Sequence, residues 1–143
     1  MKSLVTSEEF PPNIEEIREA FDLSGDELFC YGEVIYNPSK KTLTPDLINH
    51  EMVHAEQMHG QIEKWWKLYL KDPVFRASQE IPAYQVQYAT AKKYIKDRNR
   101  LHAYAVVLAK NLSGATYGNA MTFHDALSQI KAEKLFDVRS LAK

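Results

Sequence analysis

The chain has 143 residues, 45% hydrophobic and 26% charged, so we expect an ordinary globular protein with one domain over residues 1–143. Its formal net charge of −1 gives no sign of a nucleic-acid partner or of binding to an acidic membrane surface. The single cysteine excludes an internal disulfide, and no run is apolar enough for a signal core or a membrane span, so we expect a cytoplasmic protein.

The first third of the chain predicts one helix and a small sheet. Residues 13–21 show helical spacing of apolar side chains directly after Pro11 and Pro12. A turn is expected at residues 24–26. Residues 28–36 are rich in aromatic and β-branched side chains, which predicts one or two strands with Gly32 as a bulge or turn. Residues 37–41 then form a loop.

A strong helix start follows this loop. Thr44 is a suitable N-cap, Pro45 fits the first helical position, and Asp46 places an acid in the first turn. Apolar residues interleave with polar ones beyond it, which predicts a half-buried helix. We expect this helix to run towards Leu70, with a break near Gly60, and to stop at residues 72–73.

The second half of the chain predicts helices over about residues 79–95, 101–112 and 123–131. Ser78 is the expected N-cap of the first of these, which leaves Pro82 in its first turn, and Thr122 is the expected cap of the last. The expected fold class is therefore α+β, mostly helical, with a small sheet packed on the helix that begins at Pro45.

The sequence His50-Glu51-Met52-Val53-His54 is the most informative stretch of the chain. Two histidines four positions apart lie on one face of a helix, so their ring nitrogens can converge on one metal ion. Glu51 lies between them and can reach a water on that metal without being a ligand itself. This HExxH pattern predicts a zinc site with Glu51 as general base.

Catalytic zinc normally has three protein ligands, so a third must come from elsewhere. His59 points away from the pair on a continuous helix, and Gly60 stands where an extended motif would need a histidine. Cys30 is expected to pack in its apolar run, and Asp72 to lie in a loop. Glu80 is the favoured third ligand, because it opens a helical stretch in which Ala83, one turn later, allows close packing against the metal-binding helix.

These motifs resemble the gluzincin type of zinc metallopeptidase, in which a glutamate on a later helix completes HExxH. The resemblance covers residues 28 to about 88, and is closest to the minimal, single-domain forms of bacteria and phages. It implies a minimal zincin-like domain with His50, His54 and Glu80 as zinc ligands and Glu51 as general base. It also implies that the strand before the motif binds an extended peptide. Larger gluzincins often have an aspartate four residues after the glutamate ligand, where this chain has Tyr84.

The expected function is zinc-dependent peptide hydrolysis: the zinc activates a water, Glu51 takes its proton, and a peptide or protein is the substrate. One alternative is a protein-interaction domain that keeps the zinc and has lost hydrolysis. Another is a di-iron carboxylate protein, since Glu51 to His54 is also an ExxH pattern, but such sites need this pattern on two facing helices. The oligomeric state is not predicted.

Other conspicuous residues have structural explanations. Six aromatic residues are expected in the core or in the walls of a groove (Trp65, Trp66, Tyr69, Tyr84, Tyr88, Tyr94). Tyr84 shares the face of Glu80 and could also donate to a reaction intermediate, although packing is favoured. Gln57, one turn after His54, is expected to orient or pack beside the site. His102 and His124 are not expected to be ligands, and the basic residues 92–100 are explained by a solvated helix end.

Overall fold

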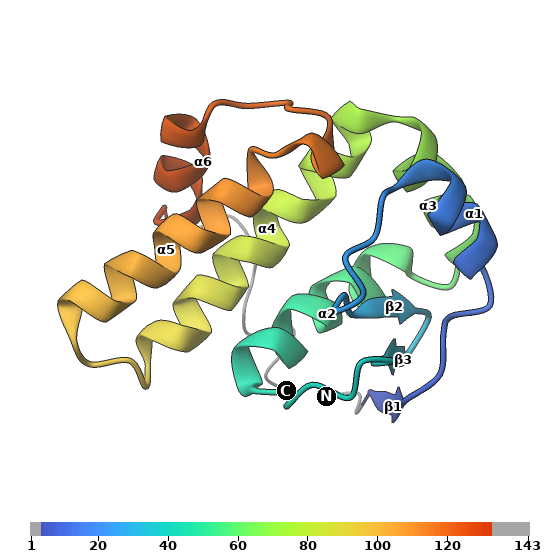
Figure 1. The fold of residues 1–143 in the computed structure, drawn as a ribbon, viewed down its shortest axis with the longest axis horizontal. Coiled ribbons are helices and arrows are strands. Elements are labelled where there is room, and N and C mark those ends of the chain that lie inside the picture. Colours follow the sequence, from blue (N-terminus) through green and yellow to red (C-terminus); the bar gives the residue numbers. More distant parts are fainter. Residues whose placement is uncertain (1–3, 133–143) are drawn as a thin grey trace.

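The computed structural model describes residues 4–132, and they form a mostly helical α+β fold with a small sheet, as predicted (Figure 1). The elements in chain order are β1 (Val5–Ser7), α1 (Ile14–Ala20), β2 (Phe29–Tyr31), β3 (Val34–Tyr36), α2 (Pro45–Met58), α3 (Ile62–Lys71), α4 (Pro73–Lys92), α5 (Arg98–Leu112), the 3₁₀ turn η1 (Ala115–Tyr117) and α6 (Phe123–Ile130). The prediction of one domain over 1–143 includes residues 1–3 and 133–143, which lie outside the described residues.

The sheet has the strand order β1-β3-β2. Strands β2 and β3 form an antiparallel hairpin whose two-residue turn contains Gly32 at φ 65, a value that favours glycine. Gly32 is therefore a turn residue and not a bulge. Strand β1 pairs in parallel with β3 and was not predicted from the sequence. Strand β2 forms one edge of the sheet and packs against α2.

Helix α2 begins and ends where the sequence indicates. Thr44 is its N-cap residue with extended backbone, and Pro45 occupies the first helical position. At the other end His59 adopts the left-handed conformation with φ 44, and Gly60 follows with φ 77. These two residues break the helix, so that α3 leaves in a new direction.

The predicted start of α4 was wrong. The helix begins at Pro73, six residues before residue 79, and its N-cap is Asp72, whose carboxylate accepts from the backbone N–H groups of Val74 and Phe75. Asp72 is both the last capping residue of α3 and the N-cap of α4. The Asp72-Pro73 pair indicates the end of a helix in the sequence, but it does not reveal that the next helix begins at once. Pro82 consequently lies inside the helix and not in its first turn. Helix α5 likewise begins three residues earlier than expected, at Arg98.

Close packing of α2 against α4 fixes the centre of the molecule. Met52 and Val53 on α2 and Ala83 and Val86 on α4 form one buried cluster, in which Ala83 is fully buried. The small side chain of Ala83 allows the two helices to approach closely, as expected from the sequence. A second cluster joins α4, α5 and α6, and a third joins α1, β2 and α3.

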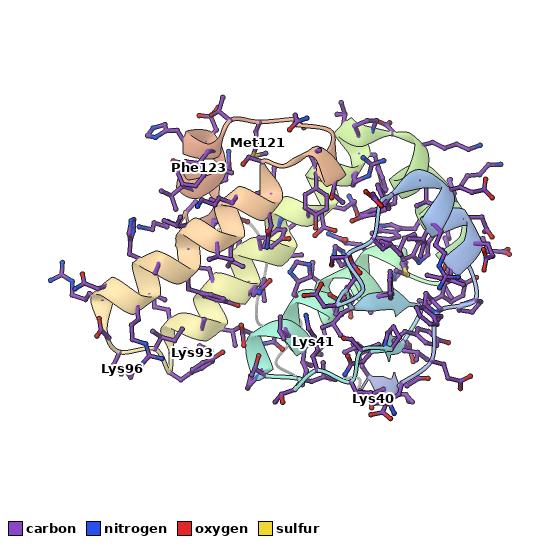
Figure 2. The ribbon with its side chains drawn as sticks, in the orientation of Figure 1. Lys40, Lys41, Lys93, Lys96, Met121 and Phe123 are labelled. Atoms are coloured by element: carbon purple, nitrogen blue, oxygen red, sulfur yellow. The ribbon has the colours of Figure 1, made fainter. Side chains whose placement is uncertain are left out.

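The aromatic residues expected in the core are buried, except that Tyr94 is 48% exposed. The basic residues Lys93 and Lys96 are exposed, and Figure 2 shows them at the turn between α4 and α5. Within residues 4–132, no helix combines the length and apolar character that a membrane crossing requires.

Candidate metal centre

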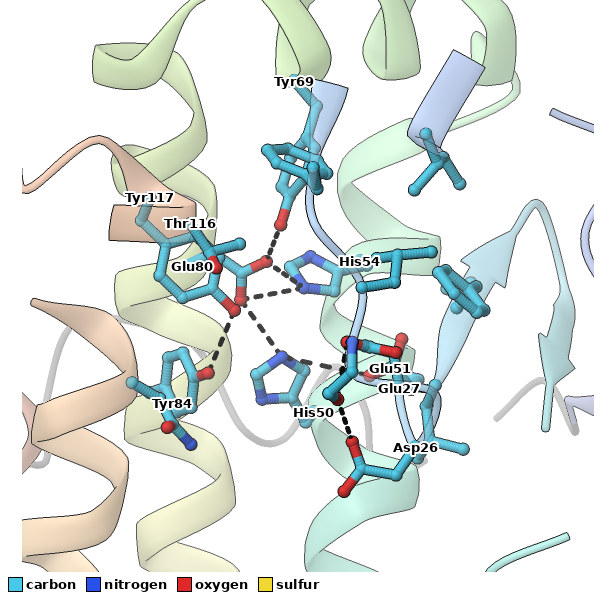
Figure 3. Close-up of a pocket in the computed structure, with 18 of the residues that line it drawn as sticks. Asp26, Glu27, His50, Glu51, His54, Tyr69, Glu80, Tyr84, Thr116 and Tyr117 are labelled. Carbon is cyan, nitrogen blue, oxygen red and sulfur yellow. Dashed lines mark hydrogen bonds and ion pairs between the residues drawn. The ribbon is translucent and has the colours of Figure 1, made fainter. Parts of the chain in front are cut away.

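Helices α2 and α4 bring His50, His54 and Glu80 together at the centre of the fold (Figure 3). The three side chains are buried, and one potential ligand atom from each lies within 4.8 Å of the others. Oε1 of Glu80 is 3.1 Å from Nε2 of His50 and 3.3 Å from Nε2 of His54. Local geometry explains the convergence, because the histidines are one turn apart on α2 and Glu80 is one turn before the close contact at Ala83.

The imidazole ring of each histidine also contacts a glutamine side chain through Nδ1, the ring nitrogen that faces away from Glu80. Nδ1 of His50 is 2.7 Å from Oε1 of Gln87, and Nδ1 of His54 is 2.8 Å from Oε1 of Gln57. An amide oxygen only accepts, so each Nδ1 carries a proton, and Nε2 is the atom through which each ring can bind a metal. The expectation that Gln57 orients the site is confirmed, whereas Gln87 was not predicted.

Glu80 is the most constrained member of the cluster. Tyr69 on α3 donates its hydroxyl to Oε2 of Glu80 at 2.5 Å. Burial would raise the pKa of Glu80, but His54 and His50 beside it hold this pKa well below its usual range. Burial alone would lower the pKa of His54, and the contact with Glu80 instead raises it to about 9. The Glu80 carboxylate is therefore ionised and pairs with a protonated His54, so a metal ion that binds here must displace the Nε2 proton.

These three residues could hold a metal ion, and two of the distances between their ligand atoms match tetrahedral coordination. With metal–ligand bonds of about 2.0–2.1 Å, ligand atoms in a tetrahedral site lie about 3.3 Å apart. The distances of 3.1 and 3.3 Å from Glu80 Oε1 to the two Nε2 atoms agree with this spacing. Outer hydrogen bonds to both imidazoles are also typical of histidines that bind metals. Among residues 4–132, this is the one group of three such side chains close enough to share an ion.

Glu51 lies beside the cluster without belonging to it. Its side chain is buried, and Oε2 is 4.0 Å from Nε2 of His50. Burial raises the pKa of Glu51, and the charge of Glu80 adds to this effect, while the two histidines oppose it. A carboxylate with a raised pKa next to a metal site is suited to accepting and returning a proton.

A cavity of about 530 Å³ opens in front of the cluster and Glu51. One wall is formed by the segment that precedes β2 and by β2 itself, and Figure 3 shows Asp26 and Glu27 on this side, near Glu51. The opposite wall is formed by the end of α5 and by η1, including Thr116 and Tyr117. The cavity has the size of a small-ligand or peptide site.

Two tyrosines meet next to the cluster in this cavity. The ring of Tyr84 packs edge-on against His50, with 4.8 Å between the ring centroids, and its hydroxyl is 3.0 Å from that of Tyr117. One of these hydroxyls donates to the other, so the pair retains one further O–H that can donate. Burial raises the pKa of both hydroxyls, which keeps them protonated at neutral pH.

The residues excluded as ligands on sequence grounds do not belong to the cluster. His59, His102 and His124 are exposed, and Cys30 is buried in the sheet. Asp72 caps α4 instead of lying in a loop. The carbonyl of Cys30 accepts a hydrogen bond from the indole of Trp66, which occupies part of the edge expected to bind peptide.

Sequence reasoning missed Tyr69, Gln87 and Tyr117 as members of the site. Gln87 carries a usable signal, because it lies two helical turns after Glu80 and therefore on the same face of α4. Tyr69 and Tyr117 carry none, since they reach the site through the packing of α3 and η1.

In comparisons with protein-family models, curated proteins and solved structures, nothing matches this chain. The interpretation of the site therefore depends on its geometry and chemistry.

Proposed function

We propose that the chain is a zinc-dependent metallopeptidase of the gluzincin type. The observation that carries this proposal is the convergence of His50, His54 and Glu80, with both Nε2 atoms turned towards Glu80 and Glu51 beside them. Two imidazoles and one carboxylate are a donor set of catalytic zinc, and this set leaves a fourth position for water or substrate. The prediction of a cytoplasmic protein accompanies this proposal and depends on the sequence alone.

Zinc held by these three residues supplies a Lewis acid that lowers the pKa of a water towards about 7 and polarises a substrate carbonyl. Glu51 accepts the proton of the attacking water at its carboxylate and returns it to the leaving amine. The spare O–H of the Tyr84–Tyr117 pair donates to the carbonyl oxygen as negative charge develops on it.

The substrate that suits the cavity is a peptide lying between the β2 edge and η1. Strand addition at the β2 edge is restricted, because the Cys30 carbonyl is already engaged by Trp66. We therefore propose that the cavity walls, more than strand pairing, position the peptide.

A di-iron centre is a poorer explanation. Such a centre needs carboxylate–histidine motifs on two facing helices, and here both histidines lie on α2 while α4 contributes one glutamate to the cluster. Two irons per chain would nevertheless be visible in the measurement below.

The test is metal content per chain, measured by plasma mass spectrometry on the wild type and on Glu80→Ala, together with hydrolysis of a mixed peptide library. We expect about one zinc in the wild type, loss of zinc in Glu80→Ala, and zinc without turnover in Glu51→Gln. A Glu51→Gln variant with full activity would exclude the general-base role. Zinc without any turnover in the wild type would instead favour the inactive protein-interaction domain.

A further inference from the structure

A chain of hydrogen bonds connects His50 to a buried carboxylate at the start of the same helix. Behind His50, Nε2 of Gln87 donates to the hydroxyl oxygen of Tyr104 at 2.7 Å. The hydroxyl of Tyr104 in turn donates to Oδ2 of Asp46, and Tyr94 donates to Oδ1 of the same carboxylate. Asp46 is only 4% exposed, and its pKa is lowered, because hydrogen bonds that include those from Tyr104 and Tyr94 outweigh the effect of burial.

We call the hydrogen-bonded chain from His50 through Gln87 and Tyr104 to Asp46 the relay of His50. The ionised carboxylate of Asp46 fixes the direction of every hydrogen bond in it. An ionised carboxylate only accepts, so Tyr104 must donate its proton to Asp46. The oxygen of Tyr104 then accepts from Gln87, which requires the NH₂ group of Gln87 to face Tyr104. The carbonyl oxygen of Gln87 consequently faces His50 and keeps a proton on Nδ1, which leaves Nε2 as the atom that can bind the metal.

The opposite orientation of Gln87 would be incompatible with metal binding. Its NH₂ group would then face Nδ1 of His50 and would need a lone pair there. The imidazole proton would move to Nε2, which is the atom that must bind the metal.

The tautomer of His54 is fixed in a similar way, through Gln57. Nε2 of Gln57 donates to the backbone carbonyl of Gln79 at 2.9 Å, and Oε1 of Gln57 faces His54. A backbone carbonyl can only accept. The relay of His50 and the corresponding chain from His54 through Gln57 to the Gln79 carbonyl therefore both end in a group that cannot donate. Only the relay of His50 ends in a side chain that a substitution can remove.

We infer that Asp46, acting through Tyr104 and Gln87, is a positioning residue that fixes the tautomer of His50 and thereby strengthens metal binding. This inference rests on the proposed metal site and assigns no role in the chemical step to Asp46. Loss of an outer hydrogen-bond partner typically weakens metal binding 10- to 100-fold. Because Tyr104 is one step removed from the imidazole, the expected effect of breaking the relay is about tenfold.

Tyr104→Phe and Tyr94→Phe are a matched pair of variants for the test. Both remove a hydroxyl that donates to Asp46, but only Tyr104 also contacts Gln87. The zinc dissociation constant is measured by competition with a chromophoric chelator. We expect Tyr104→Phe to raise it about tenfold and Tyr94→Phe to change it less than twofold. Equal changes in both variants, or no change in either, would overturn the inference.

Adding Gln87→Glu to Tyr104→Phe provides a rescue. A carboxylate at this position cannot donate, so it accepts from Nδ1 of His50 whether or not Tyr104 has a hydroxyl. We expect the double variant to regain most of the wild-type zinc affinity, and failure to do so would contradict tautomer control. In the zinc-loaded wild type, the Nδ1 proton of His50 should also exchange more slowly in nitrogen-edited NMR spectra than in Tyr104→Phe.

These readouts separate the inference from the proposed function. Zinc affinity and proton exchange do not depend on turnover, so a chain that binds zinc and hydrolyses no peptide still tests the relay. If the wild type binds no zinc, the metal site is excluded and the inference with it.

Discussion

Tyr69 donates its hydroxyl to Oε2 of Glu80 at 2.5 Å, and this contact joins α3 to the cluster carried by α2 and α4. The other carboxylate oxygen, Oε1, lies within 3.3 Å of both Nε2 atoms. Tyr69 therefore holds the Glu80 carboxylate through Oε2, an oxygen that is also 3.2 Å from Nε2 of His54. In a metal site this arrangement restricts the rotation of the Glu80 carboxylate and keeps it ready to bind.

The first prediction follows from this contact. Tyr69→Phe should keep the stacking of the ring on Trp65 and remove only the hydrogen bond to Glu80. We expect zinc affinity to fall about tenfold, measured by chelator competition. Tyr88→Phe is the control, because Tyr88 is equally buried but belongs to the cluster between α4, α5 and α6. An unchanged affinity in Tyr69→Phe would contradict the supporting role of Tyr69.

The second prediction concerns Arg76, which is 5% exposed and connects α3 to η1 beside the cavity. Its guanidinium donates to the carbonyls of Tyr69, Leu70 and Thr116 at 2.7, 3.0 and 3.2 Å, and lies 4.8 Å from the ring centroid of Phe21. A lysine cannot form these three bonds in the same fork geometry. We expect Arg76→Lys to lower the free energy of unfolding by about 3 kcal/mol in urea titrations.

Arg18→Lys is the matched control for this substitution. Arg18 pairs with Glu15 at the surface, where both side chains are largely exposed. Its replacement should change the free energy of unfolding by about 0.5 kcal/mol or less. Similar losses for the two substitutions would show that the buried bonds of Arg76 add little.

The sequence was sufficient for the parts of the fold and site that depend on helical periodicity. His50 and His54 share a face because they are four residues apart, and Glu80 shares a face with Ala83 for a similar reason. The close packing of the two helices was predictable because Ala83 is the small residue on that face. The start of α2 was predictable because Pro45 after Thr44 has a specific place at a helix N-terminus.

The remainder depends on contacts between distant segments. Tyr104 meets Asp46 across 58 positions, and Tyr84 meets Tyr117 across 33, so no local pattern indicates either pair. Strand β1 is too short to show an alternating pattern, and its pairing with β3 arises from tertiary packing. The misplaced start of α4 has another cause, since the Asp72-Pro73 pair serves equally to end one helix and to cap the next.

The third prediction is a pH dependence of stability that arises at Asp46. Burial would raise its pKa, but hydrogen bonds from Thr44, Tyr104 and Tyr94 outweigh burial and lower the pKa below its usual value of 3.8. A group with a lowered folded-state pKa stabilises the fold above its unfolded-state pKa, and this contribution is lost as the pH falls through the folded-state pKa.

Asp46→Asn should therefore be less stable than the wild type by a constant amount between about pH 5 and 7. The difference in free energy of unfolding should shrink below about pH 4, where the Asp46 carboxylate of the unfolded chain takes up a proton before that of the folded chain does. Urea titrations at several pH values measure it. A difference that is already lost between pH 7 and 5 would show that the hydrogen bonds do not lower the pKa of Asp46.

The last prediction concerns the tyrosine pair and depends on the proposed peptidase activity. The double variant Tyr84→Phe with Tyr117→Phe leaves both rings in place and removes both hydroxyls of the pair. If the spare O–H of the pair donates to the oxygen that becomes negatively charged, its loss should lower kcat about 100-fold. Zinc content should not change, because neither hydroxyl contacts a ligand atom directly in the described residues. A variant that loses zinc together with activity would assign the pair to the support of the site, and one that keeps both would exclude it from the reaction.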